Sequence, residues 1–600
     1  MISNIKNWLE KNKKIATTFA VVLILATMFG LAFFSSRGIF GDPGDSGTMD
    51  EVAHVPASYT YINDLDYRLN PEHPPLVKAL SGVFMHFNSH IVGPEKSPSW
   101  DDVGQWEAGW YMLYGSGGDP KTILDLARLP VMLLMIFLGF FLFRFASKLY
   151  GRKIGLIVLV LYAFYPDVIA HGRLVTTDVA AALGFVLAVY FFDQALRKRT
   201  WKSIIIAGLM LGIAELCKFS AILLLPIFFV LIIIKALIDR NNITNFNERF
   251  GQNFKTFLWT TIFSLVVVWL VYIPFTWNTP PAIEHKVIEM NLAIDSPILN
   301  KYKNFLHKFE NNRLTRPIGH YLVGVSQVVG RVEGGNNTYI MGYSSDKSIS
   351  WFFPAAWLLK TPISIILLAI FAVIMLFVRR KKTPDDWWKI SLFSVPLIIY
   401  WAVTLQGSLN LGIRHLMPTV PFVLLMIGYA LAPIVNAKKN VLAKSIIAAL
   451  LAFLIYSTVT NFPHYISYFN ELTAKDKRYT RMIDSSLDWG QDFLRLKQYI
   501  EDNNIQDIRI DYFGGSSVSY YLPKAQTWHA YSGPTTGWLA ISATYYQSSK
   551  LTGKIENKPS YAWLDNFEPE AIIGDSILVF NISSEDLRQK NLTPLNIVSQ

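Results

Sequence analysis

Carboxylates and imidazoles that could act together in acid–base chemistry lie in two short segments near the N-terminus. Asp50, Glu51 and His54 lie in the first segment, and Glu72 and His73 lie in the second, directly before two prolines. A carboxylate can accept a proton from a reacting hydroxyl, and imidazole and carboxylate groups can bind a divalent metal. Both segments are therefore candidates for general-base catalysis or for metal binding.

Each of these readings has a structural alternative. Adjacent helical residues point about 100° apart, so we expect only one of Asp50 and Glu51 to face a substrate, with a pKa raised by partial burial. The alternative is a helix start, because the spacing of Thr48 and Glu51 matches a capping box. For His54 and Glu72 the regular spacing of a zinc site is absent, so a polar loop is the alternative to a divalent metal site.

The composition indicates that these segments belong to an integral membrane protein. Of the 600 residues, 52% are hydrophobic, and the mean hydropathy is +0.30. The formal net charge is +11, but the Lys and Arg residues lie in short clusters between apolar runs, which the positive-inside rule explains without a nucleic-acid partner. The single Cys217 excludes a disulfide framework and a thiolate metal site.

Eleven apolar stretches are long enough to cross a hydrocarbon core of about 30 Å. They lie near residues 16–36, 126–146, 153–169, 177–196, 202–217, 219–237, 256–276, 354–378, 388–404, 413–433 and 441–461. Basic clusters at residues 11–14, 148–153, 197–202, 379–382 and 438–444 all fall on one side of this arrangement. That side, and with it the N-terminus, is predicted to be cytoplasmic.

The predicted fold is mainly α: a polytopic helical bundle over residues 1–461, with outer loops at 37–125 and 277–350. Residues 462–600 are expected to form a small extracytoplasmic α/β domain. Its strands are indicated by alternating stretches at 508–513 and 576–580, bounded by Gly, Ser and Pro.

Given this topology, five cations lie at outer span ends, where the positive-inside rule does not predict them. They are Arg128, Arg173, Lys218, Lys360 and Arg414. Snorkelling explains any one of them, but ionisable groups at membrane depth are costly, and together they favour an anionic ligand such as the phosphate or pyrophosphate of a polyprenyl carrier. Asp178, which enters the fourth span from the same side, is either a helix cap or a functional carboxylate.

A sugar attached to a lipid phosphate has a good leaving group. Its transfer requires cations to stabilise the departing phosphate and a carboxylate to activate the acceptor. Asp50 or Glu51 is the expected base. A transporter or flippase of a lipid-linked or anionic substrate is the alternative, although the paired halves typical of transporters are not found in the sequence. A scaffold protein would need the tail to carry the function.

Several short motifs lie in order between residues 49 and 418. They are Asp50-Glu51, Glu72-His73-Pro74-Pro75-Leu76, Ala127-Arg128-Leu129-Pro130, Tyr150-Gly151, the loop from Arg173 to Asp178, Lys218-Phe219-Ser220, Leu359-Lys360-Thr361-Pro362, and Asn410 to Pro418 around Arg414. In this order they resemble the GT-C glycosyltransferases of the protein O-mannosyltransferase and aminoarabinose transferase type.

The resemblance implies an inverting transfer from a dolichyl- or undecaprenyl-phosphate sugar to an extracytoplasmic protein, lipid or glycan. It implies that Asp50 is the base and that Asp178 is an acceptor-site or supporting carboxylate. A basic residue of the family that contacts donor phosphate is replaced here by His73, and Glu72 corresponds to a position that takes part in metal binding in some relatives.

The tail contains a further acidic motif, with Asp484 and Asp488 close behind the last span. This motif resembles a prokaryotic branch of the same transferases. Asp484 and Asp488 are expected either to form an acceptor site or to belong to a capped helix start that docks the tail.

Overall fold

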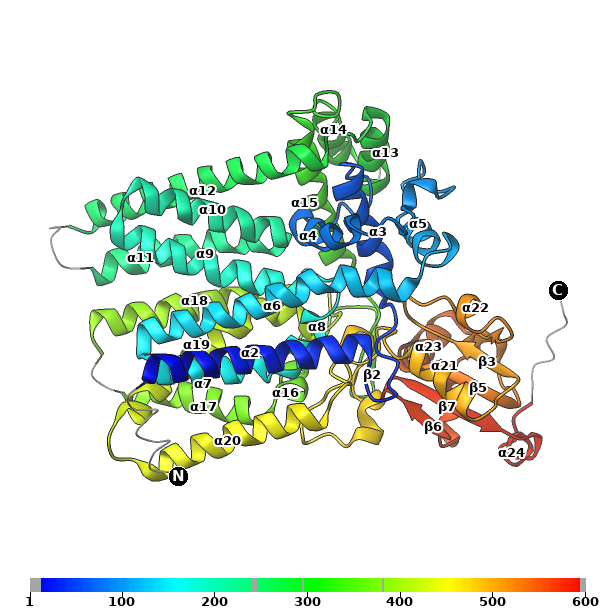
Figure 1. Cartoon of the computed structure of the whole chain (residues 1–600). Coiled ribbons are helices and arrows are strands. Elements are labelled where there is room, and N and C mark those ends of the chain that lie inside the picture. The colour runs from blue at the N-terminus through cyan, green and yellow to red at the C-terminus, as the bar shows by residue number, and fades with distance from the viewer. Residues whose placement is uncertain (1–11, 240–244, 294–295, 380–381, 594–600) are drawn as a thin grey trace.

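The computed structural model describes residues 12–239, 245–293, 296–379 and 382–593. Parts of the predicted segments lie outside the described residues, namely 1–11, 294–295 in the second outer loop, 380–381 in a basic cluster and 594–600 in the tail. The long helices run side by side in one bundle, and the C-terminal strands form a separate layer at one end of it (Figure 1).

The bundle is built from thirteen named helices. They are α2 (Lys13–Arg37), α6 (Pro120–Tyr150), α7 (Arg152–Ala163), α8 (Pro166–Gly172), α9 (Asp178–Lys198), α10 (Trp201–Cys217), α11 (Leu224–Ile238), α12 (Phe246–Phe275), α16 (Phe352–Lys360), α17 (Ile363–Val378), α18 (Pro384–Gln406), α19 (Val420–Asn436) and α20 (Val441–Thr460). Short 3₁₀ helices at Phe219–Leu223 (η3) and Ile413–Thr419 (η4) precede α11 and α19.

Among the described residues, eight helices are long and apolar enough to cross a membrane, or up to ten if each of two bent pairs is one span. Helices at the rim expose large apolar side chains such as Phe19, Leu265, Phe377 and Leu442, as expected for contact with lipid. The mainly helical membrane fold is thereby confirmed. The predicted span at 202–217 corresponds to α10, whose 17 residues are too few for it to be counted among these eight helices. The total of eleven spans remains a prediction.

Two predicted spans are bent. The axes of α7 and α8 differ by 64°, with Pro166 at the first position of α8, and those of α16 and α17 differ by 117°, with Pro362 between them. Proline disfavours helical backbone at the preceding residue and removes a backbone donor. The predicted span near 354–378 is therefore divided into two helices, and Lys360 ends α16 at the bend.

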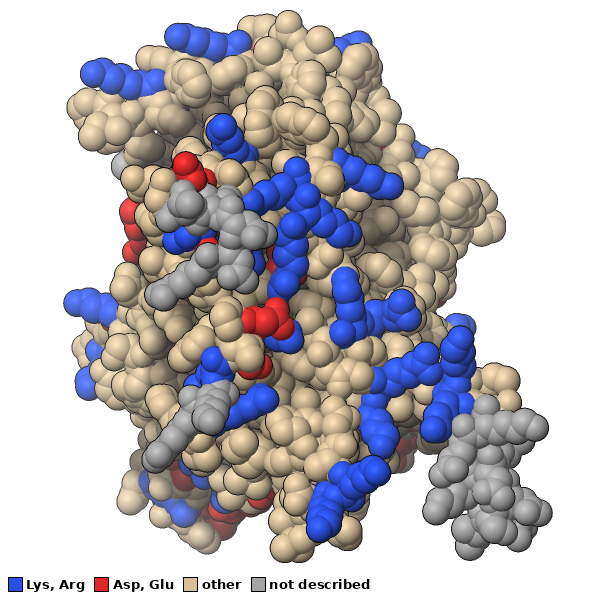
Figure 2. Space-filling model, turned by 90° about the vertical axis from the view of Figure 1, so that its left-hand side faces the viewer, with Lys and Arg blue, Asp and Glu red and all other residues tan. Residues whose placement is uncertain are grey.

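One end of the bundle, which we call the capped end, is covered by residues 37–125, 277–350 and the C-terminal region (Figure 1). Its elements are α3 (Met49–Asn63), α4 (Pro75–His86), α5 (Gln105–Trp110), α13 (Pro281–Asn291), α14 (Pro297–Leu306), α15 (Arg316–Gly334) and the antiparallel pair β1 (Thr338–Ile340) and β2 (Tyr343–Ser345). The opposite end carries many Lys and Arg residues and few acidic ones (Figure 2).

The C-terminal region contains a mixed five-stranded sheet in the order β4-β3-β5-β7-β6. Its elements are α21 (Phe493–Asp502), β3 (Ile508–Asp511), α22 (Val518–Tyr521), β4 (Gln526–Thr527), β5 (Gly537–Ser542), α23 (Ala543–Glu556), β6 (Ala571–Ile573), β7 (Ile577–Ile582) and α24 (Ser584–Gln589). Side chains alternate along β7: Ile577 and Val579 pack with α21, whereas Leu578 and Phe580 pack with Tyr546 of α23. The predicted α/β character is confirmed.

Buried ion pairs join this region to the bundle. Arg495 of α21 contacts Asp45 at 3.1 Å and Asp492 at 2.7 Å, and Arg173 contacts the other oxygen of Asp45 at 2.8 Å. Buried charges are tolerated when they are paired in this way. The pairs hold the C-terminal region against the loop that leads into α3, and so position both sides of the site described next.

Candidate active site

Two cavities meet at the capped end of the bundle. The outer cavity has a volume of about 1460 Å³ and is lined by α5, α13, α14, α15 and the C-terminal region. The inner cavity has a volume of about 190 Å³ and lies between η3, α15, α16 and α18. Both cavities are lined by Asp50, Glu72, Arg331, Leu409, Leu411 and Arg414.

The inner cavity combines cationic and apolar walls. Its basic side chains are Lys218, Arg331 and Arg414, with the imidazoles of His54, His73 and His415 beside them. Its apolar side chains include Phe219, Leu223, Val328, Val332, Phe353 and Val403. Such a lining suits an amphipathic ligand with an anionic head and a hydrocarbon chain.

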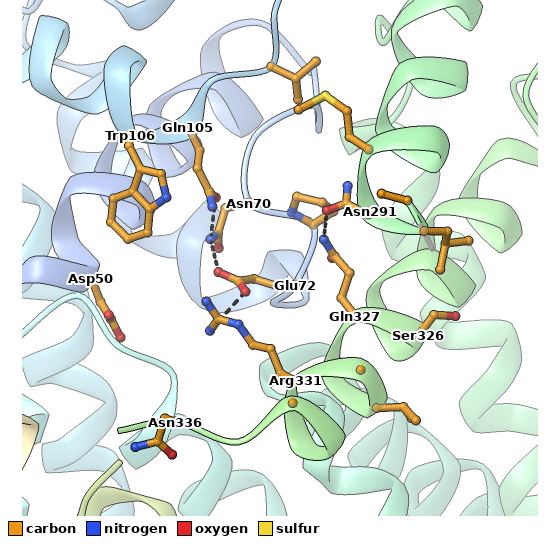
Figure 3. A pocket seen from close by; sticks show the side chains of 18 of the residues that line it. Asp50, Asn70, Glu72, Gln105, Trp106, Asn291, Ser326, Gln327, Arg331 and Asn336 are labelled. Atoms are coloured by element: carbon orange, nitrogen blue, oxygen red, sulfur yellow. Dashed lines mark hydrogen bonds and ion pairs between the residues drawn. The ribbon is translucent and has the colours of Figure 1, made fainter. Parts of the chain in front are cut away.

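The outer cavity is crossed by a chain of polar side chains (Figure 3). Asn70 Nδ2 donates to Gln105 Oε1 at 3.0 Å and to Glu72 Oε1 at 3.1 Å, and Arg331 Nη1 contacts Glu72 Oε2 at 3.1 Å. Buried Lys78 fixes the loop that carries Asn70 and Glu72. Its Nζ donates hydrogen bonds to the carbonyl oxygens of Asn70 at 2.7 Å and His73 at 3.0 Å. The outer cavity therefore presents fixed hydrogen-bonding groups.

Asp50 and Glu51, in the first turn of α3, have different surroundings. Glu51 Oε2 accepts a hydrogen bond from the backbone of Thr48 at 3.0 Å, which completes a capping box. Asp50, the preceding residue, points in another direction and lines both cavities. Its Oδ2 contacts Arg414 Nη1 at 2.8 Å, and its side chain is 25% exposed. Asp50 is thus the member of the pair that can reach a ligand.

The pKa of Asp50 differs from the sequence-based hypothesis. Burial would raise it, but the positive charge of Arg414 and the neighbouring His54 outweigh this effect and hold the pKa below its ordinary value. The hypothesis of a raised pKa is therefore wrong. A lowered pKa keeps Asp50 ionised at neutral pH and ready to accept a proton.

Glu51 and Arg128 form a buried bidentate ion pair away from both cavities. Arg128 donates from Nε to Glu51 Oε1 at 2.8 Å and from Nη2 to Glu51 Oε2 at 2.6 Å. Arg128 also donates to the carbonyl oxygens of Asp45 and Ser46. The predicted catalytic role of Glu51 and phosphate-binding role of Arg128 are not supported, because each uses its charge to satisfy the other.

Asp178 lies close to two of the five predicted cations, Lys218 and Arg414. Lys218 Nζ contacts Asp178 Oδ1 at 2.5 Å, and Arg414 Nη1 lies 3.9 Å from Asp178 Oδ2. The Arg414 guanidinium also lies over the ring of Trp489, at 4.2 Å from the ring centroid. Asp178 therefore helps to hold Lys218 and Arg414 at the inner cavity.

The structure does not bring Arg173 and Lys360 to this cavity. Arg173 is fully buried against Asp45 and donates to the carbonyl oxygen of Pro463 at 3.0 Å. Lys360 lies 3.4 Å from Asp167 and donates to two backbone carbonyl oxygens. Both cations therefore pair with a protein carboxylate, as expected for buried charges.

Known proteins are similar to this chain in one sequence segment and in the fold. Residues 124–272 match a family model described as dolichyl-phosphate-mannose-protein mannosyltransferase. The structure of the S. cerevisiae protein O-mannosyltransferase Pmt1-Pmt2 complex bound to the sugar donor has a TM-score of 0.50 and 11% identity, covering 74% of this chain and 89% of that chain. The chain therefore shares its fold with this protein O-mannosyltransferase complex, and residues 124–272 match the mannosyltransferase family. The resemblance stated from the sequence motifs is confirmed.

Two other solved structures are similar to this chain at lower TM-scores. The Archaeoglobus fulgidus oligosaccharyltransferase tethered with an acceptor peptide has a TM-score of 0.45 and 11% identity, covering 90% of this chain and 71% of that chain. ArnT from Cupriavidus metallidurans in the apo state has a TM-score of 0.29 and 12% identity, covering 94% of this chain and 98% of that chain. No curated protein sequence matches the chain.

The two predicted metal ligands, Glu72 and His54, have other partners in the structure. Glu72 is held by Asn70 and Arg331, and the Nδ1 atom of His54 lies 2.7 Å from the carbonyl oxygen of Val175. Within the described ranges, no group of three potential ligands at metal-binding distance includes His54 or Glu72. Burial lowers the pKa of both His54 and His73. His73 therefore faces the inner cavity as a neutral imidazole.

The two acidic residues of the tail motif have different places. Asp484 lines the outer cavity, as do Trp489 and Phe513 of the same region. Asp488 is buried outside both cavities, where its Oδ2 accepts a hydrogen bond from the backbone of Thr544 at 2.8 Å. The position of Asp488 agrees with the predicted docking role of this motif. Asp484 instead lines the outer cavity, where an acceptor could contact it.

Asp488→Asn is expected to flatten part of the pH dependence of stability. Burial raises the pKa of Asp488 to about 7, so the folded state favours the protonated carboxyl. Its contribution is greatest below the unfolded pKa of about 3.9 and is lost as the pH rises to about 7. The wild-type unfolding midpoint should fall more between pH 5 and pH 8 than that of the variant, and equal slopes would contradict this.

Three residues of the site were not predicted from the sequence. Arg331 lies in an outer segment, where the charge pattern indicates only cations at span ends, and Trp489 directly follows Asp488 of the acidic motif in the tail. His415 directly follows Arg414 and lines the inner cavity with its Nε2 unpartnered. Its position next to a predicted phosphate ligand was the available signal.

Proposed function

We propose that the protein transfers a sugar, with inversion, from a polyprenyl-phosphate donor in the inner cavity to an acceptor in the outer cavity. The observation that carries this proposal is the position of Asp50. It lies in the wall that both cavities share, 2.8 Å from Arg414. A base at this junction can reach an acceptor group on one side while the cations contact the donor on the other.

The inner cavity supports a lipid-phosphate donor. Lys218 and Arg414 place two positive charges at its wall, and the neutral imidazole of His73 can donate a hydrogen bond to the phosphate. The apolar side chains of η3, α15 and α18 would contact the first part of a prenyl chain. The description of the matching family, which names a dolichyl-phosphate sugar, supports the same donor class.

The outer cavity supports a larger, polar acceptor. Its volume of about 1460 Å³ exceeds the roughly 300–1,000 Å³ of ordinary small-molecule pockets. Asn70, Gln105, Ser326 and Asn336 line it with hydrogen-bonding groups (Figure 3). A segment of protein, a glycan or a lipid head group would fit this space, with Asp484 and Trp489 contributing from the C-terminal region.

In the proposed reaction, Asp50 takes the proton of the acceptor hydroxyl as its oxygen attacks the anomeric carbon. The bond between that carbon and the phosphate oxygen breaks from the opposite face, so the sugar configuration inverts. The polyprenyl phosphate leaves with an added negative charge, which Lys218 and Arg414 stabilise. Asp178 keeps these two cations in place throughout.

The proposed orientation has the N-terminus in the cytoplasm and the capped end outside. Figure 2 shows that Lys and Arg gather at the end opposite the two cavities, which is the distribution expected at a cytoplasmic face. Residues 1–461 would then carry the catalytic bundle, and residues 462–600 an extracytoplasmic domain that completes the outer cavity.

The proposal is tested by donor choice with the purified protein in detergent. Sugar transfer is expected from a polyprenyl-phosphate sugar and not from the corresponding nucleotide sugar, with one polyprenyl phosphate released for each sugar transferred. The product anomer, determined by nuclear magnetic resonance, should be opposite to that of the donor. Transfer from the nucleotide sugar, or retention of configuration, would contradict the proposal.

A further inference from the structure

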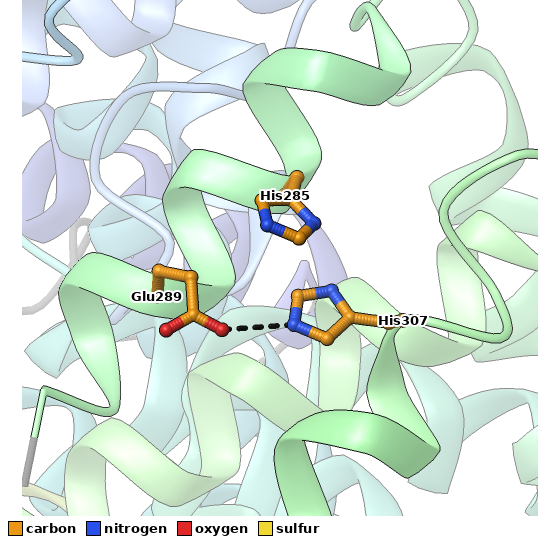
Figure 4. A group of neighbouring side chains, drawn as sticks. All are labelled: His285, Glu289 and His307. Carbon is orange, nitrogen blue, oxygen red and sulfur yellow. Dashed lines mark hydrogen bonds and ion pairs between the residues drawn. The ribbon is translucent and has the colours of Figure 1, made fainter. Parts of the chain in front are cut away.

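Three potential metal ligands lie together in the second outer segment, apart from Asp50 and both cavities (Figure 4). His285 and Glu289 lie four residues apart on α13, so they share one face of this helix. His307 follows α14 as its C-cap. One ligand atom of each of these residues lies within 4.8 Å of the others.

The surrounding charges orient these ligands. Glu310 Oε2 contacts the Nδ1 atoms of His285 at 3.2 Å and His307 at 2.9 Å. A carboxylate that accepts the Nδ1 proton leaves Nε2 as the nitrogen available to a metal, and metal-binding histidines commonly have such a partner. The second oxygen of Glu289 is held by Lys303 at 3.0 Å. The ligand set therefore has an outer layer of fixed partners.

The two imidazoles already approach each other. Their rings are stacked with centroids 4.2 Å apart and an angle of 24° between planes. His307 Nε2 lies 2.9 Å from Glu289 Oε1. A cation could take the place of the proton that these two atoms share, with small movements of exposed side chains, since His285 is 54% and Glu289 43% exposed.

We propose that His285, Glu289 and His307 bind one divalent transition metal ion, with water as a fourth ligand. Two imidazole nitrogens and one carboxylate oxygen are a ligand set that suits zinc in tetrahedral geometry. The ion would join the face of α13 to the end of α14. This site is separate from the sugar-transfer chemistry and would be present whether or not the proposed reaction is correct.

A metal at this position would stabilise one wall of the outer cavity. Met290 and Asn291, which directly follow Glu289, line this cavity, and so do Leu299 and Tyr302 of α14. The helices also share a small apolar cluster that includes Val287 and Leu306. The metal would add a tie between the same two helices at the surface, where the apolar contacts end.

The site is tested by titrating ZnCl₂ into the full-length protein, purified with a tag that contains no histidine and stripped with a chelator. Calorimetry is expected to show one site. His285→Ala and Glu289→Gln should each weaken binding by at least about 100-fold, and Glu310→Gln by about 10- to 100-fold as an outer partner. His90→Ala removes an exposed histidine elsewhere on the capped end and should leave binding unchanged.

Glu72→Gln distinguishes this site from the metal site considered in the first outer segment, and it should also leave zinc binding unchanged. Zinc should raise the thermal unfolding midpoint of the wild type but not that of His285→Ala, and the metal-free midpoints of both proteins show whether the variant is folded. Equal zinc affinity in the wild type and His285→Ala, or loss of binding in Glu72→Gln, would overturn the proposal.

Discussion

Asp50→Asn is expected to lower the rate of sugar transfer by about 10²- to 10⁴-fold, the usual contribution of a positioned general base. The amide cannot accept the acceptor proton, but it keeps the size of the carboxylate and can still accept a hydrogen bond from Arg414, which lies 2.8 Å from Asp50. The loss should therefore fall on the chemical step, with kcat reduced more than donor affinity.

The measurement is a time course of product formation with a polyprenyl-phosphate sugar, together with donor binding to the same preparations. Asp476→Asn is a matched control, because Asp476 is 66% exposed on the C-terminal region and contacts only Lys477, at 3.7 Å, among the described ion pairs. It should retain wild-type activity. If Asp50→Asn transfers sugar as fast as the wild type, Asp50 is not the base.

The fold could be predicted largely from the sequence because its signals are local. Apolar runs of about 20 residues mark spans regardless of their neighbours, and the alternation of apolar residues marked β3 and β7 in the tail. The bends were missed where tertiary packing determines how far a proline break turns the chain. At residues 361–362 a hydropathy window continues through a break at which the helix axis turns by 117°.

The candidate site was harder to predict because it depends on which charges pair with each other. Glu51 and Arg128 are 77 residues apart, and Arg173, which follows α8, pairs with Asp45 in the loop before α3. The charge pattern could place these cations at one surface, but it could not show that each pairs with a protein carboxylate and that three of the five lie outside both cavities. Lys218 and Arg414 differ because Asp178 holds both of them beside an open cavity.

Arg414→Gln is expected to lower transfer by about 10²- to 10³-fold, which is typical of losing one preorganised donor to a developing negative charge. Arg414 lines both cavities, and Asp50 and Trp489 position it on either side. Glutamine retains a hydrogen-bond donor but carries no charge. The effect should therefore appear in stabilisation of the departing phosphate.

The same variant should change the pH profile in a direction that a merely structural role would not produce. Arg414 is the largest influence that lowers the pKa of Asp50, whereas burial raises it. Without the guanidinium the pKa of Asp50 should rise, so the acid limb of kcat/KM should move to higher pH than in the wild type. Rates between pH 4 and pH 8 measure this shift, with Arg588→Gln, an exposed arginine of α24, as the matched control. An unchanged acid limb together with wild-type activity would contradict both the phosphate contact and the coupling between Arg414 and Asp50.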